Sequence, residues 1–189
     1  RVGALAPLFR DLNSRREIEP VLVLKNKKLK KVYNVNNLDE CISVSHVISS
    51  GMIIPVNVLN DVGLMKEELF IDWVDTEWCW RIRVCKYDIL VNKNLIINHR
   101  LGNESKLIFK YKIQNHSMLR QYYNIRNALV VLKEYWHFPC YREYIIIILL
   151  KNIIVYFLKN RIKEFVLLYF AISDFFKKKM FKCTHKIWM

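Results

Sequence analysis

The chain has 189 residues, enough for one ordinary domain and an appendage. Lysine and arginine total 31 against 17 acidic residues, which gives a net charge of +14. This charge could attract an anionic membrane surface or a nucleic acid, or it could reflect only a general lysine bias of the chain. The zinc-ligand, glycine-rich and stacking-aromatic patterns of nucleic-acid modules are absent from the sequence. The five cysteines are far fewer than a disulfide scaffold contains, so reduced thiols in a cytosolic setting fit best.

The first residues have the composition of an element buried inside a domain. The chain opens on Arg1, and Val2–Leu8 has the composition of a buried strand. We therefore expect a piece of a longer protein. No signal peptide can be read at this end, because a charged region followed by an apolar stretch and a small-residue cleavage site is missing.

Residues 1–116 alternate short apolar runs with turns, which is typical of an α/β domain. Pro55 begins a helix that Gly63 ends. A second helix over 74–86 has a single apolar stripe for burial. The expected strands are 2–9, 19–24, 30–35, 42–48 and 88–98, of which the second and third form a hairpin with a lysine-rich tip.

Residues 117–189 are aromatic, basic and helical in period, with Pro139 as the break. We expect a helix over 119–136 and helical runs over 144–150, 153–158 and 165–176. Each apolar run is shorter than the roughly 20 residues of a membrane span, and lysines interrupt them. Apolar faces opposed by lysine and arginine indicate helices that lie in the membrane interface. An ordinary packed helical tail is the alternative.

The densest polar group lies at the start of the second helix, where Asp72, Asp75, Glu77 and Arg81 crowd a segment with an aromatic opposite face. A helix N-terminus favours negative charge, so a carboxylate at Asp75 can accept a proton from an attacking substrate hydroxyl. Glu77 and Arg81 are four residues apart and are expected to pair. Plain helix capping is the alternative for these acidic residues.

Two further places could contact a ligand. Ser50 and Gly51 follow a strand and precede the helix at Pro55, where small residues let a ligand approach backbone amides. A tight turn explains them equally well. His99 ends a strand and is a fair metal or phosphate ligand, although one histidine is not a metal site.

Four segments follow one another in the chain: Ser-Ser-Gly-Met-Ile-Ile-Pro at 49–55, the run from Leu69 to Arg81, Asn-His-Arg-Leu-Gly at 98–102, and Arg-Gln-Tyr-Tyr-Asn-Ile-Arg-Asn at 120–127. In this order, they resemble the family 2 glycosyltransferases and, most closely, their bacterial rhamnosyltransferase branch. Residues 2–7 resemble the strand that follows the family's metal-binding Asp-x-Asp. Together these motifs cover nearly the whole chain.

The resemblance implies a GT-A fold and an inverting transfer from a nucleotide-sugar, dTDP-rhamnose, to a lipid-linked glycan in cell-surface polysaccharide synthesis. It makes Asp75 the general base and assigns Asp72, Glu77, Trp78 and Arg81 to the acceptor-side motif. Ser50 and Gly51 match the loop beneath the sugar and acceptor, and His99 matches a residue near the metal and diphosphate.

The resemblance also implies a divalent cation, Mg²⁺ or Mn²⁺, but no Asp-x-Asp occurs in these residues. We therefore expect two or three strand–helix–strand units before Arg1, each roughly 30 residues long. Residues 1–116 would then be the acceptor-side part of the catalytic domain, and 117–189 a helical membrane-interface region. The isolated chain is expected to be inactive, to bind no nucleotide-sugar and to aggregate.

The expected location is the cytoplasmic face of the bacterial cell membrane, with peripheral attachment and no nucleic-acid partner. Two rival hypotheses remain at this point. The chain could be a basic module that binds membrane surfaces or nucleic acid, with residues 72–81 only a capped helix, or it could be an inactive remnant of an enzyme.

Overall fold

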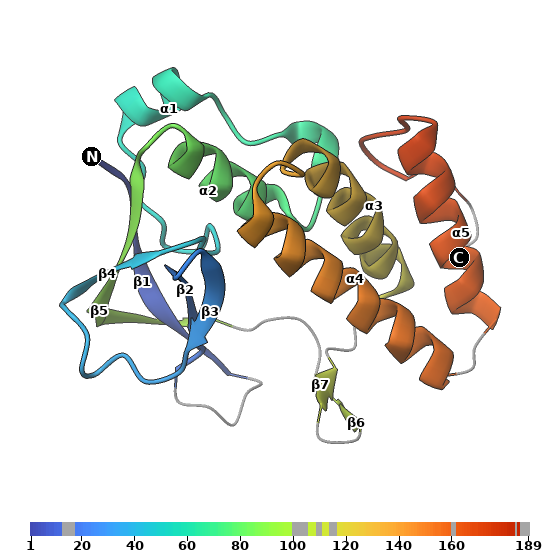
Figure 1. Cartoon of the computed structure of the whole chain (residues 1–189), viewed down its shortest axis with the longest axis horizontal. Helices are drawn as coiled ribbons and strands as arrows, with labels where there is room; N and C mark the ends of the chain where they lie inside the picture. Colours follow the sequence, from blue (N-terminus) through green and yellow to red (C-terminus); the bar gives the residue numbers. More distant parts are fainter. Residues whose placement is uncertain are drawn as a thin grey trace. The chain divides into compact units, whose positions relative to one another are not determined.

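The computed structural model describes residues 1–12, 18–99, 106–108, 111–113, 117–159, 162–183 and 185 (Figure 1). The chain is mixed α/β and forms two compact units. The first comprises Arg1–Met65 with Asp75–His116, and the second comprises Lys66–Val74 with Ser117–Met189. This division differs from the expected domains in one respect, because Lys66–Val74 belongs to the second unit.

A three-stranded sheet organises the first unit. Its strands are β1 (Val2–Asp11), β4 (Cys41–Val44) and β5 (Asp88–His99), in the order β1-β5-β4. β5 lies in the centre, parallel to β1 and antiparallel to β4. The strand expected over 42–48 ends at Val44, and the residues that follow it run along a helix instead of in the sheet.

A separate hairpin joins β2 (Val21–Lys25) to β3 (Lys28–Val32). Its two turn residues, Asn26 and Lys27, have φ angles of 52° and 58°. Positive φ at both central positions is the signature of the tight turn whose twist matches a two-stranded hairpin. A further short hairpin pairs β6 (Lys106–Ile108) with β7 (Tyr111–Ile113).

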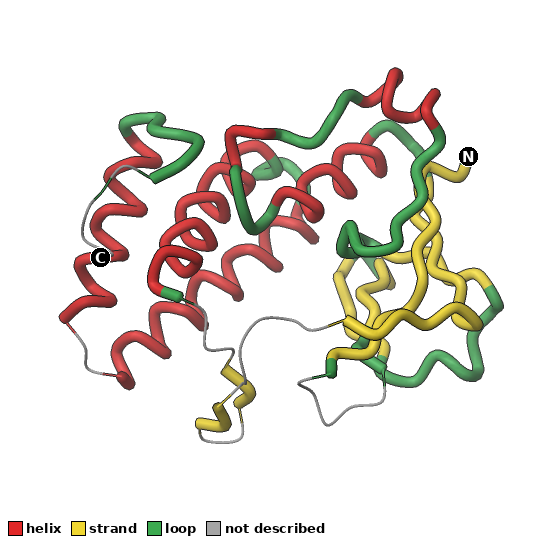
Figure 2. Tube along the Cα trace, turned by 180° about the vertical axis from the view of Figure 1, so that it is seen from behind, coloured by secondary structure: helices red, strands yellow, loops and turns green. Residues whose placement is uncertain are grey.

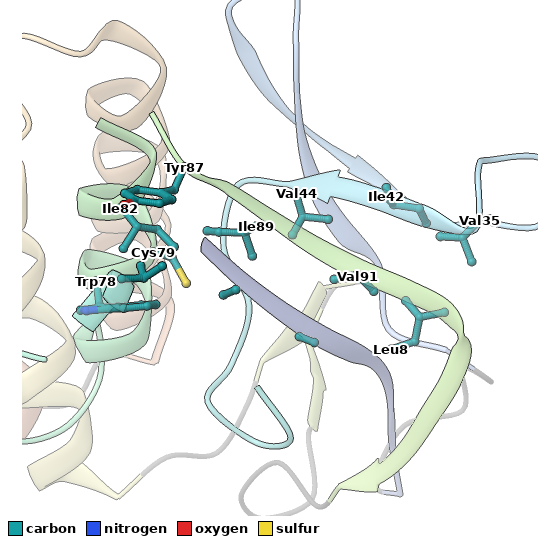
Figure 3. Packing of buried hydrophobic residues seen from close by; sticks show 13 residues of the cluster. Leu8, Val35, Ile42, Val44, Trp78, Cys79, Ile82, Tyr87, Ile89 and Val91 are labelled. Carbon is teal, nitrogen blue, oxygen red and sulfur yellow. The ribbon is translucent and has the colours of Figure 1, made fainter. Parts of the chain in front are cut away.

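Two helices complete the first unit, α1 (Val56–Val62) and α2, which spans Val74–Val84. α1 begins after Pro55 and ends at Gly63, whose φ of 87° favours glycine. α2 supplies Trp78, Cys79 and Ile82 to a buried cluster that also takes Ile89 and Val91 from β5 (Figure 3). This apolar contact holds α2 against the sheet.

The second unit is helical, with η1 (Glu67–Leu69), α3 (Met118–Glu134), α4 (Pro139–Lys159) and α5, which spans Ile162–Phe176 (Figure 2). α4 is continuous where two separate runs were expected. The Lys151-Asn152 interruption is tolerated because Lys151 is exposed and Asn152 Nδ2 donates to Asn124 Oδ1 at 3.1 Å. Among the described residues, no helix combines the length and the apolar character needed to cross a membrane.

Candidate active site

The segment after β4 runs antiparallel along α2 and is fastened by the side chains of that helix. Arg83 Nη1 donates to the Val44 carbonyl and Trp80 Nε1 donates to Ser45 Oγ, both at 3.0 Å. Nearer the start of the helix, the Cys79 thiol lies 3.8 Å from the Val47 carbonyl oxygen. Successive turns of α2 therefore fix the path of the chain toward Ser49.

That path ends at Asp75. Its Oδ2 accepts a hydrogen bond from the Ser49 backbone N–H at 3.1 Å. The structure thus brings the predicted base next to the predicted Ser50–Gly51 turn, although 26 positions separate Asp75 from Ser49 in the chain. Among the described residues no other group donates to this carboxylate, so Oδ1 has no donor there.

Gly51 lies tightly against the sheet, with φ of 74°. A Cβ at this position would meet Pro7 Cγ at 3.0 Å and Ile97 Cδ1 at 3.4 Å. Ile97 and His99 are two residues apart on β5, so their side chains leave the same face of the strand. His99 therefore lies on the face of β5 that carries the Ser50–Gly51 turn, and its backbone carbonyl accepts from Leu12 N–H at 2.9 Å.

Glu77, Trp78 and Arg81 hold the end of α1 to α2. Both oxygens of the fully buried Glu77 accept from Arg81 at 3.1 Å. Arg81 also donates to the carbonyls of Val62 and Leu64 at 2.8 Å, and Trp78 Nε1 donates to the Gly63 carbonyl at 2.9 Å. Three consecutive carbonyls at the end of α1 are thereby satisfied by side chains from α2.

Asp72 belongs to the second unit, where it forms an ion pair with Arg120. Arg120 Nε and Nη2 each donate to Asp72 Oδ1 at 3.0 Å. Of the three carboxylates at 72–77, Asp72 and Glu77 therefore have arginine partners. No lysine or arginine pairs with Asp75 among the described residues.

The segment that precedes Asp75 has an unusual backbone, since Phe70, Asp72 and Trp73 all have positive φ angles between 60° and 66°. α3 holds this conformation from the side. Asn127 Nδ2 donates to the carbonyls of Leu69, Ile71 and Asp72 at 2.7, 2.8 and 3.1 Å. Such strain persists only where surrounding contacts determine it.

The fully buried Arg126 also donates hydrogen bonds to this segment. It donates to the carbonyls of Leu69 at 3.2 Å and Glu68 at 3.3 Å, and to Asn127 Oδ1 at 2.8 Å. Neighbouring side chains of α3 thus satisfy most carbonyls of the 68–72 stretch, which is why it packs with the second unit.

Two groups beside α2, the half-buried His46 and the fully buried Cys79, have displaced pKa values. Burial, reinforced by the Lys31 charge, lowers the pKa of His46 from 6.5 to about 4, and the His46 ring meets Trp80 edge-on. Burial also raises the pKa of the Cys79 thiol to about 12. Both groups are therefore neutral at physiological pH and serve packing.

The described residues offer no ready metal site. No group of three histidine, cysteine, aspartate or glutamate side chains lies close enough among them to hold an ion. His99 therefore has no such companions in this part of the chain. The expected divalent cation therefore has no cluster of three such ligands in the part of the chain that the structure describes.

A groove of about 390 Å³ lies in the second unit, lined by Leu129, Leu132, Lys133, Trp136, His137 and Phe175. None of the predicted site residues lines it. The candidate site is therefore the partly exposed corner at Asp75 and the Ser50–Gly51 turn, and not an enclosed cavity.

Comparison with known proteins gives one informative match. No protein-family model matches the chain. The chain is 34% identical over 162 residues to the dTDP-rhamnosyl transferase RfbF of Shigella flexneri. The chain resembles a glycosyltransferase. The match covers 83% of this chain and 53% of that protein, so the chain spans about half the length of the curated relative it matches.

Sequence reasoning missed the partners that complete these contacts. Arg120, Arg126 and Asn127 belong to the motif Arg-x-Tyr-Tyr-x-x-Arg-Asn, but the motif predicts no contact with residues 68–72. A signal was present, because two arginines and an asparagine among apolar positions of one helix need polar partners when buried. The carbonyls that supply those partners could not be identified from the sequence.

Proposed function

We propose that this chain supplies the acceptor-side part of an inverting glycosyltransferase of the family 2, GT-A type. The enzyme moves rhamnose from dTDP-rhamnose to a lipid-linked glycan during cell-surface polysaccharide synthesis. The similarity to RfbF supports the donor, because that relative is named for dTDP-rhamnosyl transfer. We place the enzyme peripherally on the cytoplasmic face of the bacterial cell membrane.

Asp75 supports the proposal through the contacts that its carboxylate makes. One carboxylate oxygen is oriented by the Ser49 amide, and no cationic side chain of the described residues pairs with the group. A carboxylate held in this way can accept the proton of an acceptor hydroxyl as that hydroxyl attacks the anomeric carbon. The bond to the departing nucleotide diphosphate breaks on the opposite face, which inverts the configuration.

The other predicted residues have distinct parts in the proposal. Ser50 and Gly51 form the floor on which sugar and acceptor meet, since position 51 has no side chain and is exposed. Glu77, Trp78 and Arg81 bind protein groups, so they position α2 on the acceptor side of the site. Asp72 likewise positions the chain before Asp75 through Arg120. His99 lies beside the diphosphate of the nucleotide-sugar in this proposal.

The test is Asp75→Asn in the full-length protein, with release of dTDP from dTDP-rhamnose as the readout. The amide keeps the shape but cannot take the proton, so turnover should fall by on the order of 10² or more. The KM for the nucleotide-sugar should barely change. Asp39→Asn removes an exposed carboxylate elsewhere and serves as the matched control. Near-normal turnover in the Asp75 variant would sink the assignment.

A further inference from the structure

The outer face of α5 is apolar although it is exposed. Tyr169, Ile172 and Phe176 are spaced i, i+3 and i+7, so they form one stripe on the helix. Their exposed fractions are 66%, 37% and 75%. Leu167 and Ala171, on the opposite side of the helix, are fully buried.

The buried side of α5 already accounts for its packing. Leu167 and Ala171 join a cluster with Tyr122, Tyr123 and Ile125 of α3. Asp174 also lies on this side, where it accepts from the Tyr122 hydroxyl at 2.7 Å. Tyr169, Ile172 and Phe176 are not part of this cluster, and leaving their exposed apolar surface in water has a cost.

Positive charge directly follows the stripe. Lys177, Lys178 and Lys179 come immediately after Phe176, and all three are exposed. None of them pairs with a carboxylate among the described residues. An apolar helix face that ends in unpaired lysines matches the interface of an anionic bilayer, where acyl chains take the apolar groups and headgroups take the charges.

We propose that the stripe Tyr169, Ile172 and Phe176, with Lys177–Lys179, is the surface by which this protein binds an anionic phospholipid bilayer. The helix lies flat in the interface, and Tyr169 has the amphipathic ring that favours this depth. The inference rests on the proposed function only for the biological setting, since it names the surface that would keep the enzyme near a lipid-linked acceptor.

Other occupants fit this surface less well. A second copy of the chain would bring a body of net charge +14 against the three lysines, which is repulsive. A nucleic acid would contact the lysines but would leave Ile172 and Phe176 in water. A bilayer satisfies both groups at once.

The test is cosedimentation of the full-length protein with vesicles of phosphatidylglycerol and phosphatidylcholine, compared with phosphatidylcholine alone. Binding should need the anionic lipid and should weaken as salt rises. Tyr169→Ser with Phe176→Ser should weaken binding by about tenfold or more, because two large apolar groups no longer enter the bilayer. Replacing Lys177, Lys178 and Lys179 by glutamate should weaken it by on the order of a hundredfold or more at low salt.

Ile53→Ser and Leu64→Ser are the matched controls, because these residues are 67% and 69% exposed in the first unit. Circular dichroism should show unchanged folding in every variant. Equal binding by the stripe variants and the control variants would overturn the proposal. The proposal would also be overturned if the stripe variants lost self-association, measured by light scattering, and kept their vesicle binding.

Transfer to a short water-soluble acceptor separates this inference from the proposed function. The α5 variants should keep that activity, because the reaction needs no membrane. An enzyme that binds vesicles through α5 but transfers no rhamnose would contradict the proposed function alone. Full transfer without any vesicle binding would contradict the membrane surface alone.

Discussion

Arg120 and Asp72, 48 positions apart in the chain, form an ion pair in which two guanidinium nitrogens donate to one carboxylate oxygen. The Asp72 side chain is only 14% exposed, so this carboxylate is largely committed to the arginine. The pair fixes a residue with positive φ three positions before the proposed base.

Loss of this pair should destabilise the second unit. In a double-mutant cycle of Asp72→Ala and Arg120→Ala, we expect a coupling free energy of about 1 kcal/mol, since the pair is partly shielded from water. Chemical denaturation of the four proteins measures it. Additive effects of the two substitutions would mean that the contact contributes no stability.

Asn127→Ala should be more damaging than the ion-pair substitutions. It removes the donor that serves the carbonyls of Leu69, Ile71 and Asp72. Arg126 still donates to the Leu69 carbonyl, so the carbonyls of Ile71 and Asp72 are the ones that lose their donor, and an unsatisfied buried carbonyl costs about 1–3 kcal/mol. We expect a loss of several degrees in Tm by calorimetry. Asn124→Ala, on the same helix, removes a single side-chain contact with Asn152 and is the matched control. Equal Tm values for the two variants would contradict this view of Asn127.

Stability should depend on pH through His46. Its pKa is about 4 in the folded protein and 6.5 in the unfolded chain, so the unfolded state binds more protons between these values. The contribution of neutral His46 is complete above pH 6.5 and is lost as the pH falls toward 4, with a total of about 3 kcal/mol at most. His46→Gln should flatten the denaturation profile over this window, whereas His137→Gln, at an exposed site, should not. An unchanged slope in the His46 variant would show that another group titrates.

The cysteines should differ in reactivity. Cys79 is fully buried and has a pKa of about 12, whereas Cys41 and Cys85 are exposed. Because the thiolate is the reactive form, iodoacetamide should label Cys41 and Cys85 in the native protein and spare Cys79. Peptide mass spectrometry identifies the labelled positions, and unfolding in guanidinium provides the control in which all three react. Rapid native labelling of Cys79 would contradict its burial.

The sequence predicted the regular elements better than the connections between them. Apolar alternation indicated β1 and β5, and Pro55 with Gly63 marked the ends of α1. The strand expected over 42–48 was too long, since the backbone after Val44 bonds to side chains of α2 that no local pattern reveals. η1 was not expected for a similar reason, because its carbonyls depend on Arg126.

Within the candidate site, spacing predicted a contact inside one helix but not the contacts between segments that are distant in the chain. The i, i+4 spacing correctly predicted the Glu77–Arg81 pair. The proximity of Asp75 to Ser49 depends on chain folding over 26 positions, which periodicity cannot supply. The prediction that residues 117–189 form a membrane-interface region was made from apolar faces opposed by lysine and arginine, and the stripe on α5 gives that prediction a specific surface to test.

The hydrogen bonds from Asn127 to the carbonyls of the 69–72 stretch also set the order in which segments fold during synthesis. The donor and its acceptors are 55 to 58 positions apart, so the ribosome releases the acceptor carbonyls well before the asparagine appears. Until then water must solvate them, because an amide carbonyl cannot be buried without a donor at low cost. Helix α2 can therefore pack on the sheet early, while the residues leading into it acquire their final backbone only once α3 has formed.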